Sequence, residues 1–580
     1  MKKYVFSSYH KVVYSCLILF VLAFSSGFTD RYFEIAKNLD TFASIYRQLN
    51  SHYVDEVNPA DLLREGINAM LASLDPYTEY IPESDIEDFK MNYVSKQYAG
   101  IGVSVFTRKD KIIVSEPYEG FSAQKADIRA GDEILAINGV SVKGRGSSTV
   151  SEMLKGQKDT PVKLTIKRYG EKQPLEKTVL REVITFSNVS YAGLLQDSIG
   201  YIKLDKFLEN SAQEVKQSLL NLKRQHQINA LVLDLRGNGG GIVQESVDIV
   251  NLFVEKGRKI VTQKAKIKDK DMVYKATLAP VDPLIPLVVL VDRGSASASE
   301  IVAGAIQDLD RGTIIGNRTF GKGLVQQTIN LPYNSLLKVT VAKYYTPSGR
   351  CIQALDYAHR NADGSVRRMS DSLMAEYKTA NGRSVYDGNG IYPDLVTKEK
   401  NFHNIAYSLI SKSLHFDFAT RYRINHASIP SARTFTLSDA DFQEFTKYLA
   451  DKDYNYTTKS EKNLEELKSI AEKEHYFEDI KSEYDALKSK LVQNKKDDLI
   501  RCQDEIKEIL ESEIVSRYYF QKGRLEASFK TDVDVKEAVK VLTDKNKYVA
   551  ILKGQGPYKV IGKPKMDALV NAAQQPSNSN

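Results

Sequence analysis

The spacing of apolar residues predicts helices near the start of the chain and strands after them. Over residues 32–53 and again over 59–74, apolar side chains recur every three or four positions, and the second stretch begins at a proline. This is the period of amphipathic helices, so residues 31–92 are predicted to form a helical segment. Short apolar runs separated by glycine turns follow, and they predict a small β-rich unit. The runs are GIGVSVF, KIIVSEP, DEILAING and PVKLTIKR.

From about residue 199, strand-like and helix-like segments alternate. The strand-like segments are GYIKL, ALVLDLR, PLVVLVD and TIIG, and the helix-like ones are AQEVKQSLLNLKRQ, IVQESVDIVNLFV and SASEIVAGAIQDL. This order predicts an α/β layer with a largely parallel sheet. From about residue 401 the chain is helical and charged. A single apolar stripe there predicts one long amphipathic helix, and it consists of Leu464, Leu467, Phe477, Ile480, Tyr484, Leu487 and Leu491.

Composition narrows the class of protein without naming a function. A chain of 580 residues is too long for one hydrophobic core, so roughly three to five domains are expected. The apolar share of 42% with 27% charged residues is typical of folded soluble domains. The net charge of +7 is small for this length, and basic and acidic residues are interspersed, so nucleic-acid binding is not expected. Cysteines and histidines show no metal-ligand spacing, so neither a metal nor another cofactor is expected.

The amino end has the layout of an export signal. Lys2, Lys3 and Lys11 precede an uninterrupted 17-residue run, residues 12–28, that is mostly apolar. A basic flank before such a run is typical of secretory signals, and the run is long enough to serve as an uncleaved membrane anchor. We therefore expect an exported protein whose residues 1–30 are a signal peptide or an anchor.

Two turns of the α/β region carry residues suited to chemistry. In ALVLDLRGNGGGIVQ, Gly237 and residues 239–241 follow a strand and precede a helix. Glycines allow backbone amides to approach a ligand closely, and such amides can hold an oxyanion, although a plain turn fits the pattern equally well. The carboxyl ends of parallel strands gather reactive groups, which favours a site at this edge of the sheet.

The second turn, in DRGSASASEIVAGAIQDL, offers three serines at a strand-to-helix junction. Ser295, Ser297 and Ser299 all lie near the positive end of the predicted helix, where a serine can cap the helix or act as a nucleophile. Glu300 and Asp308 follow on that helix, either as structural partners of the site or as solvated surface charges.

A serine nucleophile needs a base, and Lys322 is the candidate because no histidine falls in or next to these segments. The surrounding GNRTFGKG resembles a phosphate-binding loop, but Gly323 stands where that loop needs Ser or Thr, and β-forming residues follow instead of a helix. Phe320, Leu324 and Val325 flank the lysine and are predicted to keep it dry, which would lower its pKa from about 10.4 toward neutrality. A lysine base paired with serine is a known variant of triad chemistry.

Together these motifs resemble those of the carboxy-terminal processing peptidases, the tail-specific serine proteases of family S41 that bacteria export. The matching stretches run in family order between about residues 30 and 400. They are LDPYTEYIP, YAGIGVSV, KADIRAGDEILAINGV, LDLRGNGGG, DRGSASASEIVAGAIQD, GNRTFGKGLVQ, YYTPSGRCIQ and GNGIYPDL. Cys351 departs from the serine that the family commonly has at its place.

The resemblance implies an α/β fold, with a crotonase/Clp-like protease core, an inserted PDZ domain, an N-terminal helical segment and a C-terminal helical extension. The implied division is 1–30 signal peptide or anchor, 31–92 helical segment, 93–180 PDZ domain, 181–400 Ser-Lys peptidase core and 401–580 extension.

The resemblance also implies roles for individual residues. Ser297 corresponds to the nucleophile, Lys322 to the general base and Gln326 to the residue that orients the lysine. The oxyanion hole would use the amide of Ala298 and that of either Gly240 or Gly241. The β-rich unit would bind a peptide carboxyl terminus through a loop matched by Tyr98, Gly100, Ile101 and Gly102.

The expected function is a serine endopeptidase of the cell envelope that cleaves protein C-terminal regions through an acyl-enzyme intermediate. The expected location is the periplasm or the periplasmic face of the inner membrane. Expected partners are unfolded or tail-exposed proteins, and an activating adaptor or lipoprotein and a homo-oligomer are compatible with the resemblance. A PDZ scaffold with a gated or inactive core is the alternative from the binding class. A P-loop nucleotidase and an enolate-stabilising enzyme of crotonase type are less well supported.

Overall fold

The computed structural model describes the chain except for residues 1–31, 87–88, 90–96 and 565–580. The expected export segment, residues 12–28, therefore lies outside the described residues. Among the helices that are described, none combines the length and hydropathy needed to cross a membrane.

The chain divides into two compact units. The first consists of the described part of Met1–Glu83 with Gln326–Thr340, and the second of the described parts of Ser84–Val325 and Val341–Asn580. The first unit confirms the predicted helices, which span residues 32–52 and α2 (Pro59–Ala72). Asn58 caps α2 by accepting a hydrogen bond from the amide of Ala60, and Pro59 occupies the first helical turn, where its missing N–H costs nothing.

A short strand and the tip of a hairpin, Gln326–Thr340, complete the first unit. β1 (Glu79–Ile81) pairs antiparallel with β18 (Leu336–Tyr345), which also pairs with β17 (Leu324–Asn330). β17 is the strand predicted after the lysine loop, so the element that a phosphate-binding loop would need is absent there.

The predicted β-rich unit forms one antiparallel sheet in the second unit. Its strands are β3 (Val103–Arg108), β4 (Lys111–Pro117), β5 (Glu133–Ile137), β6 (Val140–Ser141), β7 (Pro161–Lys167) and β8 (Leu175–Leu180). Helix α5 (Ser147–Leu154) packs beside β3. A two-stranded ladder of β2 (Gln97–Gly100) with β9 (Glu182–Thr185) adjoins this unit.

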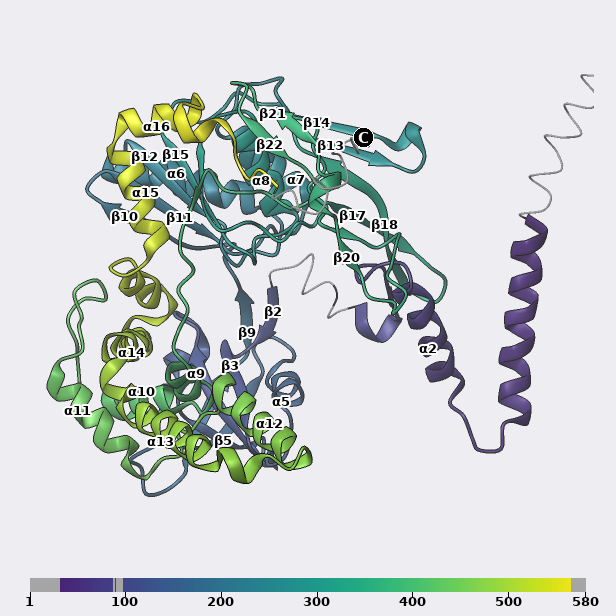
Figure 1. Ribbon diagram of the computed structural model, residues 1–580. Helices are drawn as coiled ribbons and strands as arrows, with labels where there is room; N and C mark the ends of the chain where they lie inside the picture. Colours follow the sequence, from purple (N-terminus) through teal and green to yellow (C-terminus); the bar gives the residue numbers. More distant parts are fainter. Residues whose placement is uncertain (1–31, 87–88, 90–96, 565–580) are drawn as a thin grey trace, which may run out of the picture. The chain divides into compact units, whose positions relative to one another are not determined.

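The α/β region forms a six-stranded sheet in the order β10-β11-β12-β15-β16-β23. Figure 1 labels the first four of these strands. Only β10 runs antiparallel to its neighbour, so the predicted largely parallel sheet is confirmed. The strands are β10 (Val189–Gln196), β11 (Ile199–Leu204), β12 (Ala230–Asp234), β15 (Leu287–Val291), β16 (Thr313–Gly316) and β23 (Leu395–Val396).

Helices cover both faces of this sheet. Leu233 and Val289 point into a core shared with α6 (Ser211–His226), α7 (Val243–Asn251) and α8 (Ala298–Asp308). The alternate residues Val232 and Val288 pack instead against α15 (Val533–Thr543) and α16 (Lys545–Leu552). Because strand side chains alternate between faces, both covers are needed to bury these apolar strands.

Packing therefore crosses the expected boundary at residue 401. Val541 and Ile551 are fully buried against the sheet of the α/β region, so the last helices complete that core (yellow in Figure 1). The helices that lie between the core and these last helices in the sequence form a separate apolar cluster. These helices include α9 (Asn404–Ser411), α10 (Leu414–Asn425), α11 (Asp439–Tyr448) and α14 (Gln503–Ser528).

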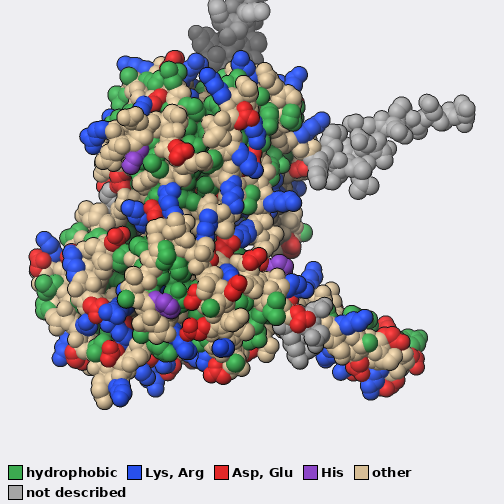
Figure 2. All heavy atoms as spheres, turned by 90° about the vertical axis from the view of Figure 1, so that its left-hand side faces the viewer, with side chains coloured by type: hydrophobic (Ala, Val, Ile, Leu, Met, Phe, Trp, Pro, Cys, Tyr) green, Lys and Arg blue, Asp and Glu red, His purple; other side chains and the backbone are tan. Residues whose placement is uncertain are grey.

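The single long helix predicted over the apolar stripe is wrong. Two helices, α12 (Lys459–Lys473) and α13 (Phe477–Arg501), pack on one another, and His475 between them has φ of 63°. A residue in the left-handed conformation ends a helix. The spacing of apolar residues does not reveal this break, because the apolar stripe continues with helical spacing on both sides of the turn. Charged side chains of both signs are interspersed on the face shown in Figure 2, in keeping with the small net charge.

Candidate active site

The three serines of the second turn have different surroundings. The hydroxyl of Ser295 donates to the carbonyl of Leu235 (2.9 Å), and that of Ser299 donates to the carbonyl of Asn238 (2.8 Å). Both serines are fully buried, whereas Ser297 is 9% exposed and is the N-cap residue of α8. Two hydroxyls are thus committed to holding the turn, and Ser297 is the one that geometry leaves for chemistry.

Ser297 has a backbone conformation that few non-glycine residues adopt, with φ of 55° and ψ of −113°. Such a conformation costs about 1–3 kcal/mol and persists only where the surroundings impose it. The strained turn projects the residue from the end of β15 at the amino end of α8, next to the positive end of the helix dipole.

The carboxylate of Glu300 binds the strained turn and joins it to the lysine loop. Its Oε2 accepts hydrogen bonds from the amides of Ser297 (2.9 Å) and Lys322 (2.8 Å). Its Oε1 accepts from the hydroxyl of Thr319 (2.5 Å) and the amide of Gly321 (2.7 Å). Burial raises the pKa of this carboxyl, and the four donors oppose that rise. Glu300 is fully buried, so the reading of it as a solvated surface charge is wrong.

A second side chain joins the same two residues and was missed from the sequence. The hydroxyl of Tyr344 donates to the carbonyl oxygens of Ser297 (2.9 Å) and Lys322. Tyr344 lies in YYTPSGRCIQ, a segment that carried the family resemblance, but no local pattern shows where its side chain reaches.

The surroundings of Lys322 match the expectation only in part. Leu324 is buried and Val325 packs against the core, but Phe320 is 43% exposed and does not shield the lysine as expected. The amide of Phe320 donates to the carbonyl of Ser295 (3.0 Å), which fixes the backbone of the loop at this residue. Lys322 itself is half-buried.

Asp308, the second predicted supporting residue, anchors a neighbouring loop. Its carboxylate binds the guanidinium of Arg350 (2.8 Å) and accepts from the amide of Ser348 (3.0 Å). Both members of the ion pair are buried, so Asp308 is not a solvated surface charge either. Its contacts stabilise the loop after β18 and do not reach the serine.

Gln326 belongs to the other compact unit. Its side-chain amide donates to the hydroxyl of Thr340 (3.1 Å), which lies in the same unit. Its role in orienting Lys322 stays a prediction.

The glycine turn after β12 lies directly against the nucleophile turn. Gly240 has φ of 100°, and a Cβ there would come within 2.8 Å of the Ser297 Cβ and 2.9 Å of the Ala298 nitrogen. Only glycine permits this approach. The amide of Gly240 donates to the side-chain oxygen of Asn238 (2.9 Å), while that of Gly241 donates to no group among the described residues. The amide of Ala298, at the first position of α8, likewise has no acceptor within the described chain.

Asn238 couples the two turns. Besides accepting from Gly240, it accepts through its carbonyl from the amide of Ala296 (3.0 Å) and the hydroxyl of Ser299. Its side-chain nitrogen donates to the carbonyl of Leu204 (2.8 Å). This fully buried amide thus fixes the glycine turn to the serine turn.

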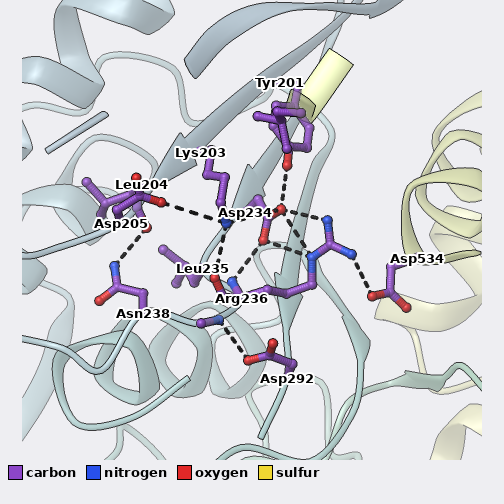
Figure 3. Close-up of polar contacts among 12 residues, drawn as sticks. Tyr201, Lys203, Leu204, Asp205, Asp234, Leu235, Arg236, Asn238, Asp292 and Asp534 are labelled. Atoms are coloured by element: carbon purple, nitrogen blue, oxygen red, sulfur yellow. Dashed lines mark hydrogen bonds and ion pairs between the residues drawn. The ribbon is translucent and has the colours of Figure 1, made fainter. Parts of the chain in front are cut away.

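A buried ionic network supports the start of the glycine turn (Figure 3). Asp234, at the end of β12, accepts from the hydroxyl of Tyr201 and pairs with Arg236 (2.7 Å). Burial by itself would raise the pKa of Asp234, but the charges of Arg236 and Lys203 outweigh it and hold that pKa below its usual range. The carboxylate therefore stays ionised beneath the turn.

The same network reaches the C-terminal helices. The guanidinium of Arg236 also binds Asp532 (2.8 Å) and Asp534 (2.8 Å) at the amino end of α15. The carboxylate of Asp292 accepts from the amide of Gly237 (2.9 Å), which closes the base of the turn (Figure 3). Residues nearly 300 positions later in the chain thus hold the arginine that precedes the glycines.

The predicted terminus-binding residues line a groove beside β3. Tyr98, Gly100, Ile101 and Gly102 lie along a cavity of about 490 Å³ that is also bounded by Leu154 of α5. Gly102 has φ of 75°, and a Cβ there would clash with the Cβ of Phe121 at 2.5 Å. The amides of Ile101 and Gly102 donate to no acceptor among the described residues.

This groove reaches the peptidase core, because Asp205, Lys206 and Leu208 line its other side. Phe207, between them, donates through its amide to the carbonyl of Gly240 (3.3 Å). One wall of the cavity that would receive a peptide end is therefore hydrogen-bonded to the glycine turn. In the described residues, no group of His, Cys, Asp and Glu side chains is arranged to hold a metal ion.

A small antiparallel unit together with an α/β sheet that has a strained serine at its carboxyl edge is the arrangement expected of a PDZ-bearing serine peptidase, and family models assign the chain to that class. Three family models match successive parts of the chain. They are the PDZ domain over residues 90–167, peptidase family S41 over 198–358 and the probable PDZ-protease C-terminal helical domain over 405–542.

Known proteins agree with these matches. A carboxy-terminal-processing protease of Bartonella bacilliformis is 34% identical over 322 residues, covering 55% of this chain and 73% of the relative. A probable CtpA-like serine protease of Staphylococcus aureus is 34% identical over 317 residues, covering 54% of this chain and 62% of the relative. The chain belongs to peptidase family S41, and it is a serine-type C-terminal processing peptidase.

Two solved structures are similar to parts of the chain. A photosystem II D1 C-terminal processing protease is 30% identical, with a TM-score of 0.33, and covers 54% of this chain and 89% of its own. The PDZ domain of a carboxy-terminal protease from Vibrio cholerae, solved in complex with a peptide, is 26% identical with a TM-score of 0.15 and covers 16% and 99%.

Proposed function

We propose that this chain cleaves the C-terminal regions of unfolded or tail-exposed proteins with Ser297 as nucleophile and Lys322 as general base. The observation that carries the proposal is the pair of side chains that join the two residues: Glu300 binds both amides and Tyr344 both carbonyls. Two residues that are each held at their own N–H and C=O can keep a hydroxyl and an amine in one reacting geometry.

The chemistry follows in two proton transfers. Neutral Lys322 takes the Ser297 proton as the oxygen attacks the substrate carbonyl, and the protonated lysine then gives that proton to the leaving amine. The acyl-enzyme is hydrolysed by a water that the same lysine activates. The amide of Ala298 and an amide of the Gly240–Gly241 turn stabilise the tetrahedral oxyanion.

The PDZ unit receives the substrate end. A peptide added as a strand beside β3 would place its terminal carboxylate at the amides of Ile101 and Gly102, which have no acceptor within the described chain. The solved PDZ relative in complex with a peptide supports this part of the proposal. Export to the cell envelope is proposed from the basic and apolar residues at the amino end.

The test is cleavage of an unfolded substrate, casein carrying three added alanines at its carboxyl terminus, by the full chain in detergent. Wild type is compared with Ser297→Ala, Lys322→Ala and, as matched control, Ser372→Ala, at an exposed serine whose hydroxyl contacts that of Ser370. Loss in the first two variants with retention in the control is expected. Cleavage that survives Ser297→Ala would refute the assignment of the nucleophile.

Location has its own measurement. Fractionation of cells that express the full chain should place it in the envelope. Recovery of the full-length protein from the cytosol alone would contradict the proposed export.

A further inference from the structure

Tyr344 is positioned where one hydroxyl touches both halves of the proposed catalytic pair. It lies on β18, is 1% exposed, and its amide donates to the carbonyl of Gly323 (3.0 Å). Its backbone thus holds the lysine loop, and its side chain spans from that loop to the serine turn.

The contacts of Tyr344 are complementary to those of Glu300. Glu300 accepts from the N–H groups of Ser297 and Lys322, whereas Tyr344 donates to their C=O groups. An acceptor alone would leave each residue free to rotate about its bound amide. A donor at the opposite end of each residue removes that freedom, which matters because Ser297 has a strained backbone that only its surroundings maintain.

The single hydroxyl proton makes the two bonds interdependent. A phenol has one proton to donate, so the carbonyls of Ser297 and Lys322 share it, and each approaches the same oxygen. The hydroxyl therefore fixes the separation of the two peptide groups more directly than two independent donors would. Burial of the whole side chain excludes water as a replacement donor.

We propose that Tyr344 is a positioning residue that sets the register between the Ser297 turn and the Lys322 loop. Its hydroxyl donates to the two backbones, and we infer that its effect on catalysis passes through them. The inference rests on the proposed function, because it takes Ser297 and Lys322 as the reacting pair.

Tyr344→Phe removes the hydroxyl and keeps the ring and the backbone bond to Gly323. The expected result is a fall in kcat of about 10- to 100-fold with KM within about threefold, since a misplacement of about 1 Å costs about that much in rate. The pH dependence of kcat should also shift, because the lysine amine moves relative to the serine. Rates are taken per folded molecule, measured by near-ultraviolet circular dichroism well below the melting temperature.

Two further variants make the result specific to the donor. Tyr345→Phe, on the next residue of the same strand, should retain wild-type kcat, since that ring lies against Lys264 on another side. Replacing Tyr344 by p-aminophenylalanine supplies two N–H donors on a ring of the same size, and it should restore most of the kcat lost in Tyr344→Phe.

The outcomes separate the possibilities. Wild-type kcat and pH profile in Tyr344→Phe, or loss of stability without loss of rate per folded molecule, would overturn the inference. A loss that p-aminophenylalanine does not rescue would overturn the role of the donor. If Ser297→Ala abolishes cleavage while Tyr344→Phe cleaves normally, only this inference fails; if Ser297→Ala cleaves, the proposed function fails.

Discussion

The substitution Glu300→Gln tests whether one carboxylate holds the nucleophile and the base together. Each oxygen of Glu300 accepts two hydrogen bonds, Oε1 from Thr319 and Gly321 and Oε2 from Ser297 and Lys322. The side-chain amide of glutamine has one oxygen and one NH₂ group. One of the two oxygens that now accept hydrogen bonds is therefore replaced by NH₂, whose hydrogens face the two groups that donated to that oxygen.

The better orientation of the amide can be worked out from these contacts. If the NH₂ group faces Thr319, it can donate a hydrogen bond to the Thr319 hydroxyl oxygen. That oxygen has two lone pairs, and one of them already accepts from the amide of Ile391 (2.7 Å). The amide of Gly321 and the hydroxyl of Thr319 then both lose Oε1 as their acceptor, and leaving one such donor unpaired in a buried site costs about 1–3 kcal/mol. The remaining oxygen still accepts from Ser297 and Lys322, but without a charge, and such bonds are about half as strong.

We therefore expect Glu300→Gln to fold with a free energy of unfolding lowered by about 1–3 kcal/mol and kcat lowered by about 10-fold. Urea unfolding followed by circular dichroism and casein cleavage measure the two quantities. Glu245→Gln is the matched control, because that carboxylate accepts from the amides of Asn210 (2.9 Å) and Ala212 (2.8 Å) without contact to the site. The control should keep its kcat. A Glu300→Gln protein with the stability of wild type would refute the bonding, and one that loses stability but not kcat would refute the positioning role.

Three further changes test other parts of the structure. Lys322→Arg places a side chain that stays protonated near neutral pH, so kcat should fall by about 100- to 10,000-fold. In the wild type, kcat/KM should rise with increasing pH and show an apparent pKa well below 10.4, whereas a rise only near pH 10 would contradict a lysine base. Since the pKa of Asp234 is lowered in the folded state, its stabilisation is complete above about pH 4 and is lost as the pH falls toward the folded pKa; Asp234→Asn should lower the melting temperature at pH 7 and flatten its acid dependence, and an unchanged acid limb would refute this. Val541→Ala, in the fully buried face of α15, should cost about 1–3 kcal/mol by urea unfolding, whereas Val533→Ala, 45% exposed on the same helix, should cost far less; equal costs would contradict the packing of α15 on the sheet.

The predicted chemistry and the observed packing differ in informative ways. Local pattern placed the strand-to-helix junction, the three serines and the lysine loop, because strand and helix periods and turn glycines are properties of neighbouring residues. It did not show that the hydroxyls of Ser295 and Ser299 donate to backbone carbonyls. Those two hydrogen bonds leave Ser297 as the candidate nucleophile. It also predicted a shielding role for Phe320, whose ring lies at the surface.

The division into domains shows the same limit. Family order along the chain indicated a peptidase core followed by a helical extension, but Val541 and Ile551 of that extension bury the second face of the core sheet. The amphipathic pattern of α15 predicts that one face is buried, and it carries no information on which surface buries it.

The sequence by itself determined the elements, their order and the residue types of a serine peptidase, because these depend on spacing and side-chain chemistry over a few residues. Only the tertiary structure decided how Glu300 and Tyr344 tie Ser297 to Lys322, and how Asp534 reaches Arg236. These contacts join residues 22, 47 and 298 positions apart. A hydrogen bond depends on distance and direction in space, which for residues so far apart in the chain are set by the packing of the whole core.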